Sequence, residues 1–139
     1  MLRRVLALVA FGLFAAPVLA GDIVVDVDIP TQQMQVSVDG ELTYTFDVST
    51  GRQGYSTPPG RYDVVRMYRK YHSKKYDNAP MPYAIFFHGG YAIHGTTDLK
   101  HLGKIASHGC VRLHPDNARM LYDLVQQEGS KNVVIRVTG

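Results

Sequence analysis

The chain has 139 residues, of which 45% are hydrophobic and 19% are charged. This length and composition are typical of one globular domain with its own hydrophobic core, and they exclude an intrinsically disordered chain. The formal charge is +3, but two of the 15 basic residues and none of the 12 acidic ones lie in the first twenty positions, so 13 against 12 leave +1 for the remainder. That balance gives no general affinity for nucleic acid.

Residues 1–20 differ from the rest and predict a signal peptide. Arg3 and Arg4 are followed by a short apolar run, and the segment closes with small residues up to Ala20, which is the pattern of a secretory leader. We expect cleavage after Ala20, a mature domain over 21–139, and export to the periplasm or cell wall. A transmembrane helix needs about 20 apolar residues, so an uncleaved anchor is the weaker alternative.

The mature chain begins with runs in which apolar and polar residues alternate, and this period of two predicts half-buried antiparallel strands. Asp39-Gly40 stands between two such runs and indicates a hairpin turn. The segment over 66–82 is basic, rich in tyrosine and aperiodic, which predicts a long loop of functional importance. The strands are expected over 23–29, 34–38, 42–48, 62–67, 83–87, 91–94 and 133–137.

One helix is predicted over 115–128. Pro115 suits the first helical position, Asp116 places negative charge in the first turn, and Gly129 is a suitable stop. The apolar stripe of this segment has helical spacing. The sequence therefore predicts a mainly β domain with one prominent helix.

The chain contains a single cysteine, Cys110. A lone cysteine in an exported protein is either a reactive thiol or an intermolecular partner, unless it is an inert residue packed in the core. If the segment over 107–113 is extended, His108, Cys110 and Arg112 share one face. Two cationic neighbours would lower the pKa of the thiol and favour the reactive thiolate.

A nucleophilic thiol also needs a base within hydrogen-bond distance. His94 ends a short apolar run, where a strand end would aim it into a loop junction, while His101 and His114 are expected to be structural. Paired metal-ligand spacings such as C-x-x-C or H-E-x-x-H do not occur in the sequence, so no metal and no cofactor is expected.

These residues stand in a longer pattern, and the chain resembles the L,D-transpeptidase catalytic domain (YkuD) family over roughly 22–139. The family's central motif corresponds to Ile93-His94-Gly95 followed by Ser107-His108-Gly109-Cys110-Val111-Arg112. Further agreement lies at Val48–Gly51, Thr57–Gly60, Ala79–Tyr83 and Phe86-Phe87. The resemblance implies a β-sandwich of mixed sheets with one prominent α-helix after the catalytic cysteine.

The resemblance also implies a mechanism on peptidoglycan stem tetrapeptides. Cys110 attacks the carbonyl of the third stem residue and expels the terminal D-alanine, and an amine of a neighbouring stem resolves the thioester into a 3–3 cross-link. Carbapenem-type β-lactams would acylate the same thiol. The resemblance implies that His94 is the general base and that the Gly95 carbonyl orients its ring. His108 and Ser107 would support the site, and the backbone N–H groups of Gly109 and Cys110 would form an oxyanion hole. The implied substrate-binding residues are Arg112, Met81 and Tyr83.

Several alternatives stay open at this stage. Water could resolve the thioester, which would make the protein an L,D-carboxypeptidase, or the acceptor could be a wall-linked lipoprotein. A non-catalytic wall-binding module is the distant alternative. The basic loop, with Arg69, Lys70, Lys74 and Lys75, either meets stem-peptide carboxylates or is a solvated surface. The expected partners are stem peptides, with no nucleic acid, and the expected state is a monomer.

Overall fold

The computed structural model describes Gly12 and residues 22–139. The predicted leader over 1–20, apart from Gly12, lies outside the described residues, as does the first residue of the predicted mature domain. Within the described part of the chain, no helix is long and apolar enough to cross a membrane.

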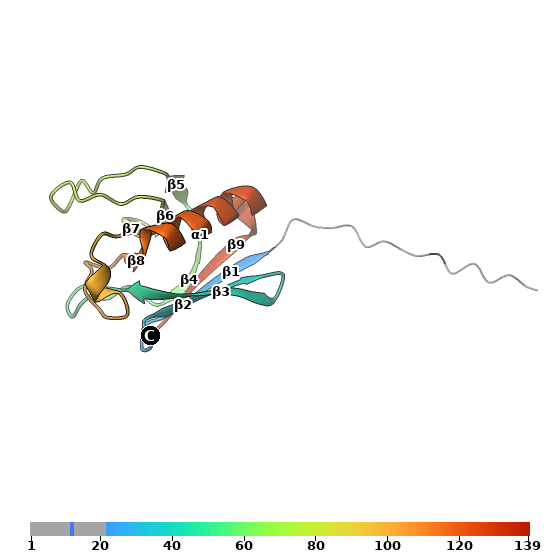
Figure 1. The fold of residues 1–139 in the computed structure, drawn as a ribbon, viewed down its shortest axis with the longest axis horizontal. Coiled ribbons are helices and arrows are strands. Elements are labelled where there is room, and N and C mark those ends of the chain that lie inside the picture. Colours follow the sequence, from blue (N-terminus) through green and yellow to red (C-terminus); the bar gives the residue numbers. More distant parts are fainter. Residues whose placement is uncertain (1–11, 13–21) are drawn as a thin grey trace, which may run out of the picture.

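The alternating runs at the start form an antiparallel meander. It consists of β1 (Ile23–Asp28), β2 (Gln33–Val38) and β3 (Glu41–Ser49). Asp39 and Gly40 form the turn between β2 and β3, with φ values of 52° and 78°, as the Asp-Gly signal predicts for a tight hairpin. In β1 and β2 the apolar side chains of the alternation are buried, so these strands present one face to the core (Figure 1).

The predicted strand over 62–67 is divided in the structure. Its first part belongs to β4 (Gly60–Asp63), which pairs with β9 (Val133–Thr138), and β9 in turn pairs in parallel with β1. Its second part is β5 (Arg66–Tyr68), which pairs with β6 (Ala84–His88). The prediction of one continuous strand was therefore wrong, because the chain crosses here from one edge of the sheet to the other.

The remaining strands carry the residues of the central motif. These are β7 (Tyr91–Gly95), antiparallel to β6, and β8 (Val111–Leu113), parallel to β7. The C-terminal end of β3 pairs with β8 through Val48 and Ser49, whereas the rest of β3 pairs with β2. β3 thus joins two halves into one curled, mixed sheet of nine described strands in the order β4-β9-β1-β2-β3-β8-β7-β6-β5.

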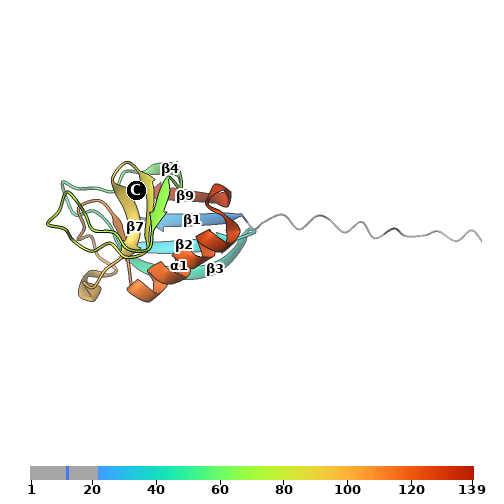
Figure 2. The same cartoon turned by 90° about the horizontal axis from the view of Figure 1, so that it is seen from above.

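The helix α1 (Pro115–Glu128) follows β8 and packs against β7 and β6 (Figures 1 and 2). His114 caps its start by accepting a hydrogen bond from the Asp116 N–H at 3.1 Å, and Gly129 lies at its C-terminal end with φ of 92°. One face of α1 enters the same core as both halves of the sheet through Ala118, Leu121, Tyr122 and Val125.

The predicted fold class is confirmed. The described residues form a mainly β domain with a single prominent α-helix, which begins five residues after Cys110. The layers of the expected sandwich are the two halves of the curled sheet, and their facing side chains form one continuous hydrophobic core.

We expect the core to depend on α1 through its buried stripe. Leu121 is 1% exposed and its neighbour Met120 is 40% exposed. Leu121→Ala should lower the free energy of unfolding by about 2–5 kcal/mol, whereas Met120→Ala should change it by roughly 0.5 kcal/mol or less. Urea denaturation of both variants tests this, and equal losses would contradict the assigned helix face.

Candidate active site

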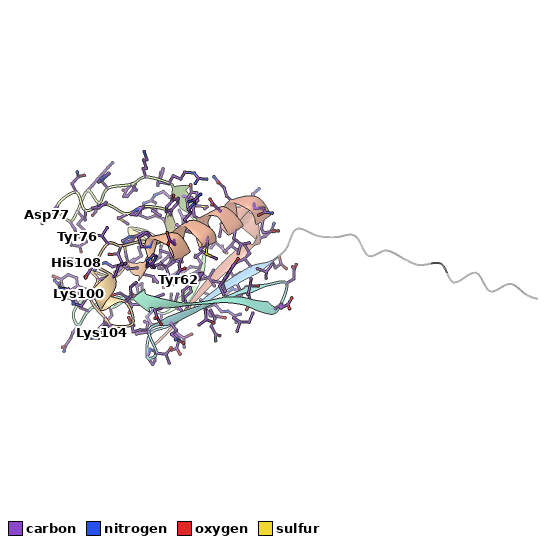
Figure 3. The ribbon with its side chains drawn as sticks, viewed as in Figure 1. Tyr62, Tyr76, Asp77, Lys100, Lys104 and His108 are labelled. Carbon is purple, nitrogen blue, oxygen red and sulfur yellow. The ribbon has the colours of Figure 1, made fainter. Side chains whose placement is uncertain are left out.

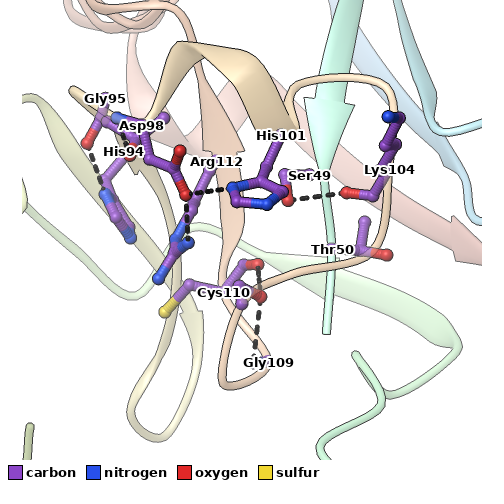
Figure 4. Close-up of polar contacts among 12 residues, drawn as sticks. Ser49, Thr50, His94, Gly95, Asp98, His101, Lys104, Gly109, Cys110 and Arg112 are labelled. Atoms are coloured by element: carbon purple, nitrogen blue, oxygen red, sulfur yellow. Dashed lines mark hydrogen bonds and ion pairs between the residues drawn. The ribbon is translucent and has the colours of Figure 1, made fainter. Parts of the chain in front are cut away.

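A cleft at one end of the molecule collects most of the residues expected at the site. Its lining includes Gly95, Ser107, His108, Arg112 and Met81, together with His94 and Cys110. The segments that meet there are the end of β7, the loop before β8, and the long loop between β5 and β6 (Figures 3 and 4). The structure therefore brings the two halves of the central motif to one place.

Tyr83 is the exception among the expected substrate-binding residues. It does not line the cleft; its ring packs edge-on against Tyr122 of α1 with centroids 5.7 Å apart. The backbone of Tyr83 has φ of 55°, a conformation uncommon for residues with a side chain. In the structure Tyr83 forms a contact between the long loop and α1, and its substrate-binding role stays a prediction.

The parallel pairing of β7 with β8 places His94 beside the cysteine loop. His94 pairs in register with Arg112, and Cys110 immediately precedes β8. His94 is 6% exposed, and its Nδ1 lies 2.7 Å from the Gly95 carbonyl oxygen. Because a carbonyl only accepts, Nδ1 carries the proton, and Nε2 of the neutral ring is left as a proton acceptor. The Gly95 carbonyl thus fixes the orientation of the His94 ring in this structure.

Burial lowers the pKa of His94 from 6.5 to about 4, with Arg112 acting in the same direction and the bond to the Gly95 carbonyl opposing it. Desolvation disfavours the imidazolium because a buried charge loses its hydration. At neutral pH His94 is therefore uncharged and able to accept a proton.

The expected low pKa of the thiol is not found. Burial raises the pKa of Cys110, although a hydrogen bond with the Ala92 backbone and the Arg112 guanidinium act in the opposite direction. The expectation relied on nearby cations, but loss of solvent outweighs them here. Cys110 is therefore a neutral thiol at rest, and its Sγ lies 3.9 Å from the Gly90 carbonyl oxygen.

The loop before β8 is a tight turn and not an extended strand. Gly109 has φ of 120°, and a Cβ at this position would overlap the ring of Tyr91. This turn, and not simple alternation along a strand, brings His108, Cys110 and Arg112 to the same cleft.

Ser107 holds this turn together and is 1% exposed. Its hydroxyl donates to the Cys110 carbonyl at 2.6 Å and accepts from the Gly109 N–H at 3.1 Å. The Gly109 N–H therefore has an acceptor already and would have to leave Ser107 to face a developing oxyanion, so its place in the oxyanion hole stays a prediction. Thr57 adds a second restraint by donating to the Gly109 carbonyl at 2.7 Å. Sequence reasoning assigned Thr57 no role at the site.

His108 has contacts of its own, separate from those of His94. Its Nε2 lies 3.1 Å from Nη2 of Arg52, and its ring stacks on Tyr76 with centroids 4.2 Å apart (Figure 3). The pKa of His108 is lowered by partial desolvation and by the cations Arg52 and Arg112. No motif in the sequence pointed to Arg52.

Arg112 faces an acidic residue that sequence reasoning also missed. Asp98 Oδ2 lies 4.0 Å from Nη1 of Arg112 and 2.6 Å from Nδ1 of His101 (Figure 4). His101, in the short helix η1 (Leu99–His101), thus bonds to Asp98, and His114 caps α1.

The basic loop is divided between two environments. Arg69 binds α1 through Asp123 at 3.3 Å and Gln126 at 3.1 Å, so it stabilises the base of the loop. Lys74 and Lys75 line the cleft. Among the described residues, no three His, Cys, Asp or Glu side chains gather to hold a metal ion.

The chain belongs to the L,D-transpeptidase catalytic domain family, YkuD, whose pattern matches residues 22–135. Two Bacillus subtilis proteins assigned to the L,D-transpeptidases are similar in sequence. YqjB is 30% identical, with 77% of this chain and 68% of that protein covered, and YkuD is 24% identical, with 71% and 58% covered.

Solved structures of L,D-transpeptidases share the fold. The enzyme from Stackebrandtia nassauensis is 33% identical with a TM-score of 0.75, and 85% of this chain and 56% of that chain are covered. The enzyme from Mycobacterium smegmatis is 25% identical with a TM-score of 0.76, and 86% and 59% are covered. This chain therefore spans less than two thirds of the length of these solved proteins.

The buried environment of His94 predicts an unusual titration. His94 takes up a proton near pH 6.5 in the unfolded chain and near pH 4 in the folded protein. The free energy of unfolding should therefore fall as the pH drops from about 6.5 to about 4. An NMR titration of the imidazole signals should show His94 neutral at pH 5.5, with its proton on Nδ1. A midpoint near 6.5 would contradict the assigned burial.

Proposed function

We propose that this protein is a cysteine-dependent L,D-transpeptidase that acts on peptidoglycan stem peptides. The observation that carries the proposal is the joint placement, in one cleft, of a thiol and a neutral imidazole whose Nε2 is the proton-accepting nitrogen. Membership of the family supports the substrate class. Export to the periplasm or cell wall, where such a substrate lies, is part of the proposal and depends on the leader-like residues 1–20.

The proposed reaction begins with the Cys110 thiol and the His94 imidazole both uncharged. As Cys110 Sγ attacks the carbonyl of the third stem residue, Nε2 of His94 accepts the thiol proton, and negative charge develops on the carbonyl oxygen. The Cys110 N–H is the proposed donor to that oxygen, and Gly109 could join it only by giving up its bond to Ser107. The intermediate then collapses, and the departing D-alanine amine takes the proton from His94.

The second half of the reaction transfers the acyl group. An amine of an acceptor stem attacks the thioester, passes a proton to Nε2 of His94, and leaves as the amide product. The proton then returns to the departing sulfur and restores the thiol. Since the thiol pKa is raised and the His94 pKa is lowered, thiolate forms only as the carbon–sulfur bond forms, which limits reaction of the resting enzyme with other electrophiles.

The direct test is to incubate the protein lacking residues 1–20 with purified muropeptides and identify the products by mass. Cross-linked dimers and free D-alanine are expected. Cys110→Ser should reduce turnover by at least about 100-fold, because a hydroxyl is a much weaker nucleophile than a thiol beside the same base. Tripeptides without dimers would indicate a carboxypeptidase instead, and unchanged muropeptides would refute the enzyme.

Two histidine variants serve as a matched control in the same assay. His94→Ala should lower kcat by about 10²–10⁴-fold, the usual contribution of a general base. His108→Ala should cost clearly less, because its Nε2 is engaged by Arg52. The reverse order would assign the base to His108.

Lys74 and Lys75 give the cleft positive charge where a stem peptide would enter. We propose that they attract its carboxylates. The double variant Lys74→Gln/Lys75→Gln should raise KM about three- to tenfold at low salt, since exposed ion pairs contribute roughly 0.2–1 kcal/mol each, and the effect should fade as salt screens the charges. Lys70→Gln is the control, because Lys70 is exposed on the same loop but does not line the cleft. An equal effect of Lys70→Gln would reject a specific role.

A further inference from the structure

His108 is held from three sides by residues outside the central motif. Arg52 places Nη2 3.1 Å from its Nε2. Tyr76 stacks on the imidazole with an interplanar angle of 13°, and Tyr55 meets it edge-on, with centroids 5.0 Å apart. Arg52 and Tyr55 come from the turn after β3, and Tyr76 comes from the long loop between β5 and β6. The ring therefore joins two segments that are distant in the sequence.

The contact with Arg52 determines which nitrogen of His108 carries the proton. A guanidinium has only donor groups and stays protonated, so the Nε2 of His108 must be the acceptor. A neutral imidazole carries one proton, and that proton is then on Nδ1. To accept a proton from a thiol at Nε2, His108 would first have to release Arg52, and the resulting imidazolium would face a guanidinium.

Arg52 is itself fixed in this position. Its backbone N–H donates to the Ser107 carbonyl at 2.9 Å, and its guanidinium lies over the ring of Tyr55 at 4.7 Å. Among the described residues, no carboxylate lies within ion-pair distance of Arg52. The positive charge of Arg52 therefore lies next to His108 without a carboxylate partner among the described residues.

We propose that Arg52 is a positioning residue that acts through His108. By occupying Nε2, it holds His108 as the neutral Nδ1–H tautomer, withholds this imidazole from Cys110, and leaves the base role to His94. The catalytic meaning of this arrangement rests on the proposed function, whereas the tautomer itself does not. His94 and His108 both line the cleft. In this proposal their different roles follow from their hydrogen-bond partners, and His108 is not the base although it is nearer to Cys110 in the sequence.

Partial desolvation and the cations Arg52 and Arg112 oppose the protonation of His108. Arg52 and Tyr55 face it from the turn after β3, Tyr76 faces it from the long loop with Lys75 5.4 Å above its own ring, and Arg112 acts from β8. The charged groups in this set are cations. Tyr76 stacks on the neutral His108 ring. This contact holds the part of the long loop that carries Lys74 and Lys75 beside the cleft.

The test compares Arg52→Met, which has a similar length but no donor, with Arg52→Lys, which keeps a donor and the charge. In ¹⁵N-histidine-labelled protein, the wild type and Arg52→Lys should show His108 protonated at Nδ1. Arg52→Met should populate the Nε2–H tautomer and raise the pKa of His108, while the His94 signals stay unchanged and report an intact fold. Nε2–H in the wild type, or an unchanged tautomer and pKa in Arg52→Met, would overturn the proposal.

A second measurement separates positioning from a merely structural role. Turnover of muropeptides by His94→Ala should rise several-fold when Arg52→Met is added, because the two His108 tautomers then exchange freely and the Nδ1–H form offers a free Nε2 to accept the thiol proton. A merely structural role of Arg52 predicts a further loss of turnover in the double variant. A rate equal to or below that of His94→Ala would overturn the proposal that Arg52 keeps His108 from acting as the base. If the wild-type protein does not turn over muropeptides, the proposed function fails, and the NMR comparison still decides the tautomer.

Discussion

The parallel pairing of β7 with β8 is the constraint on which the rest of the site depends. It places His94 in register with Arg112, and it therefore fixes the turn that carries Cys110 beside the end of β7. The same short strand β8 also pairs with the end of β3 and leads directly into α1. A slip of one residue in this register would reverse the faces of His94 and Arg112. The core that holds β8 in place is thus also what holds the proposed nucleophile near its base.

Burial gives the site its chemical state. It lowers the pKa of His94 and raises the pKa of Cys110, so both groups rest uncharged. Arg112 supports the neutral form of His94 and opposes that of Cys110. The Gly95 carbonyl then selects the tautomer of His94 that exposes Nε2. Desolvation and one backbone hydrogen bond together leave His94 uncharged at neutral pH with Nε2 unprotonated, which is the state that the proposed general base requires.

Hydrogen bonds and one ring-stacking contact join the turn after β3 and the long loop to the cysteine turn. Ser107 and Thr57 restrain the backbone of Gly109 and Cys110, and Arg52 and Tyr76 restrain His108. Neither group of contacts is local in the sequence. The residues that line the cleft lie between Arg66 and Arg112, and the turn after β3 supports them through Arg52 and Thr57 without lining the cleft itself.

The sequence by itself determined the strands of period two, the Asp39-Gly40 turn, the helix from Pro115 and the residue types of the site, because these depend on local backbone preference and on spacing. The divided strand at β4 and β5, the packing of Tyr83 on α1 and the engaged N–H of Gly109 depend on which segments meet, and no local pattern reports that. Only the tertiary structure decided the charge state of Cys110 and the different hydrogen-bond partners of His94 and His108. The physical reason is that desolvation and the occupancy of a ring nitrogen are set by neighbours from distant parts of the chain.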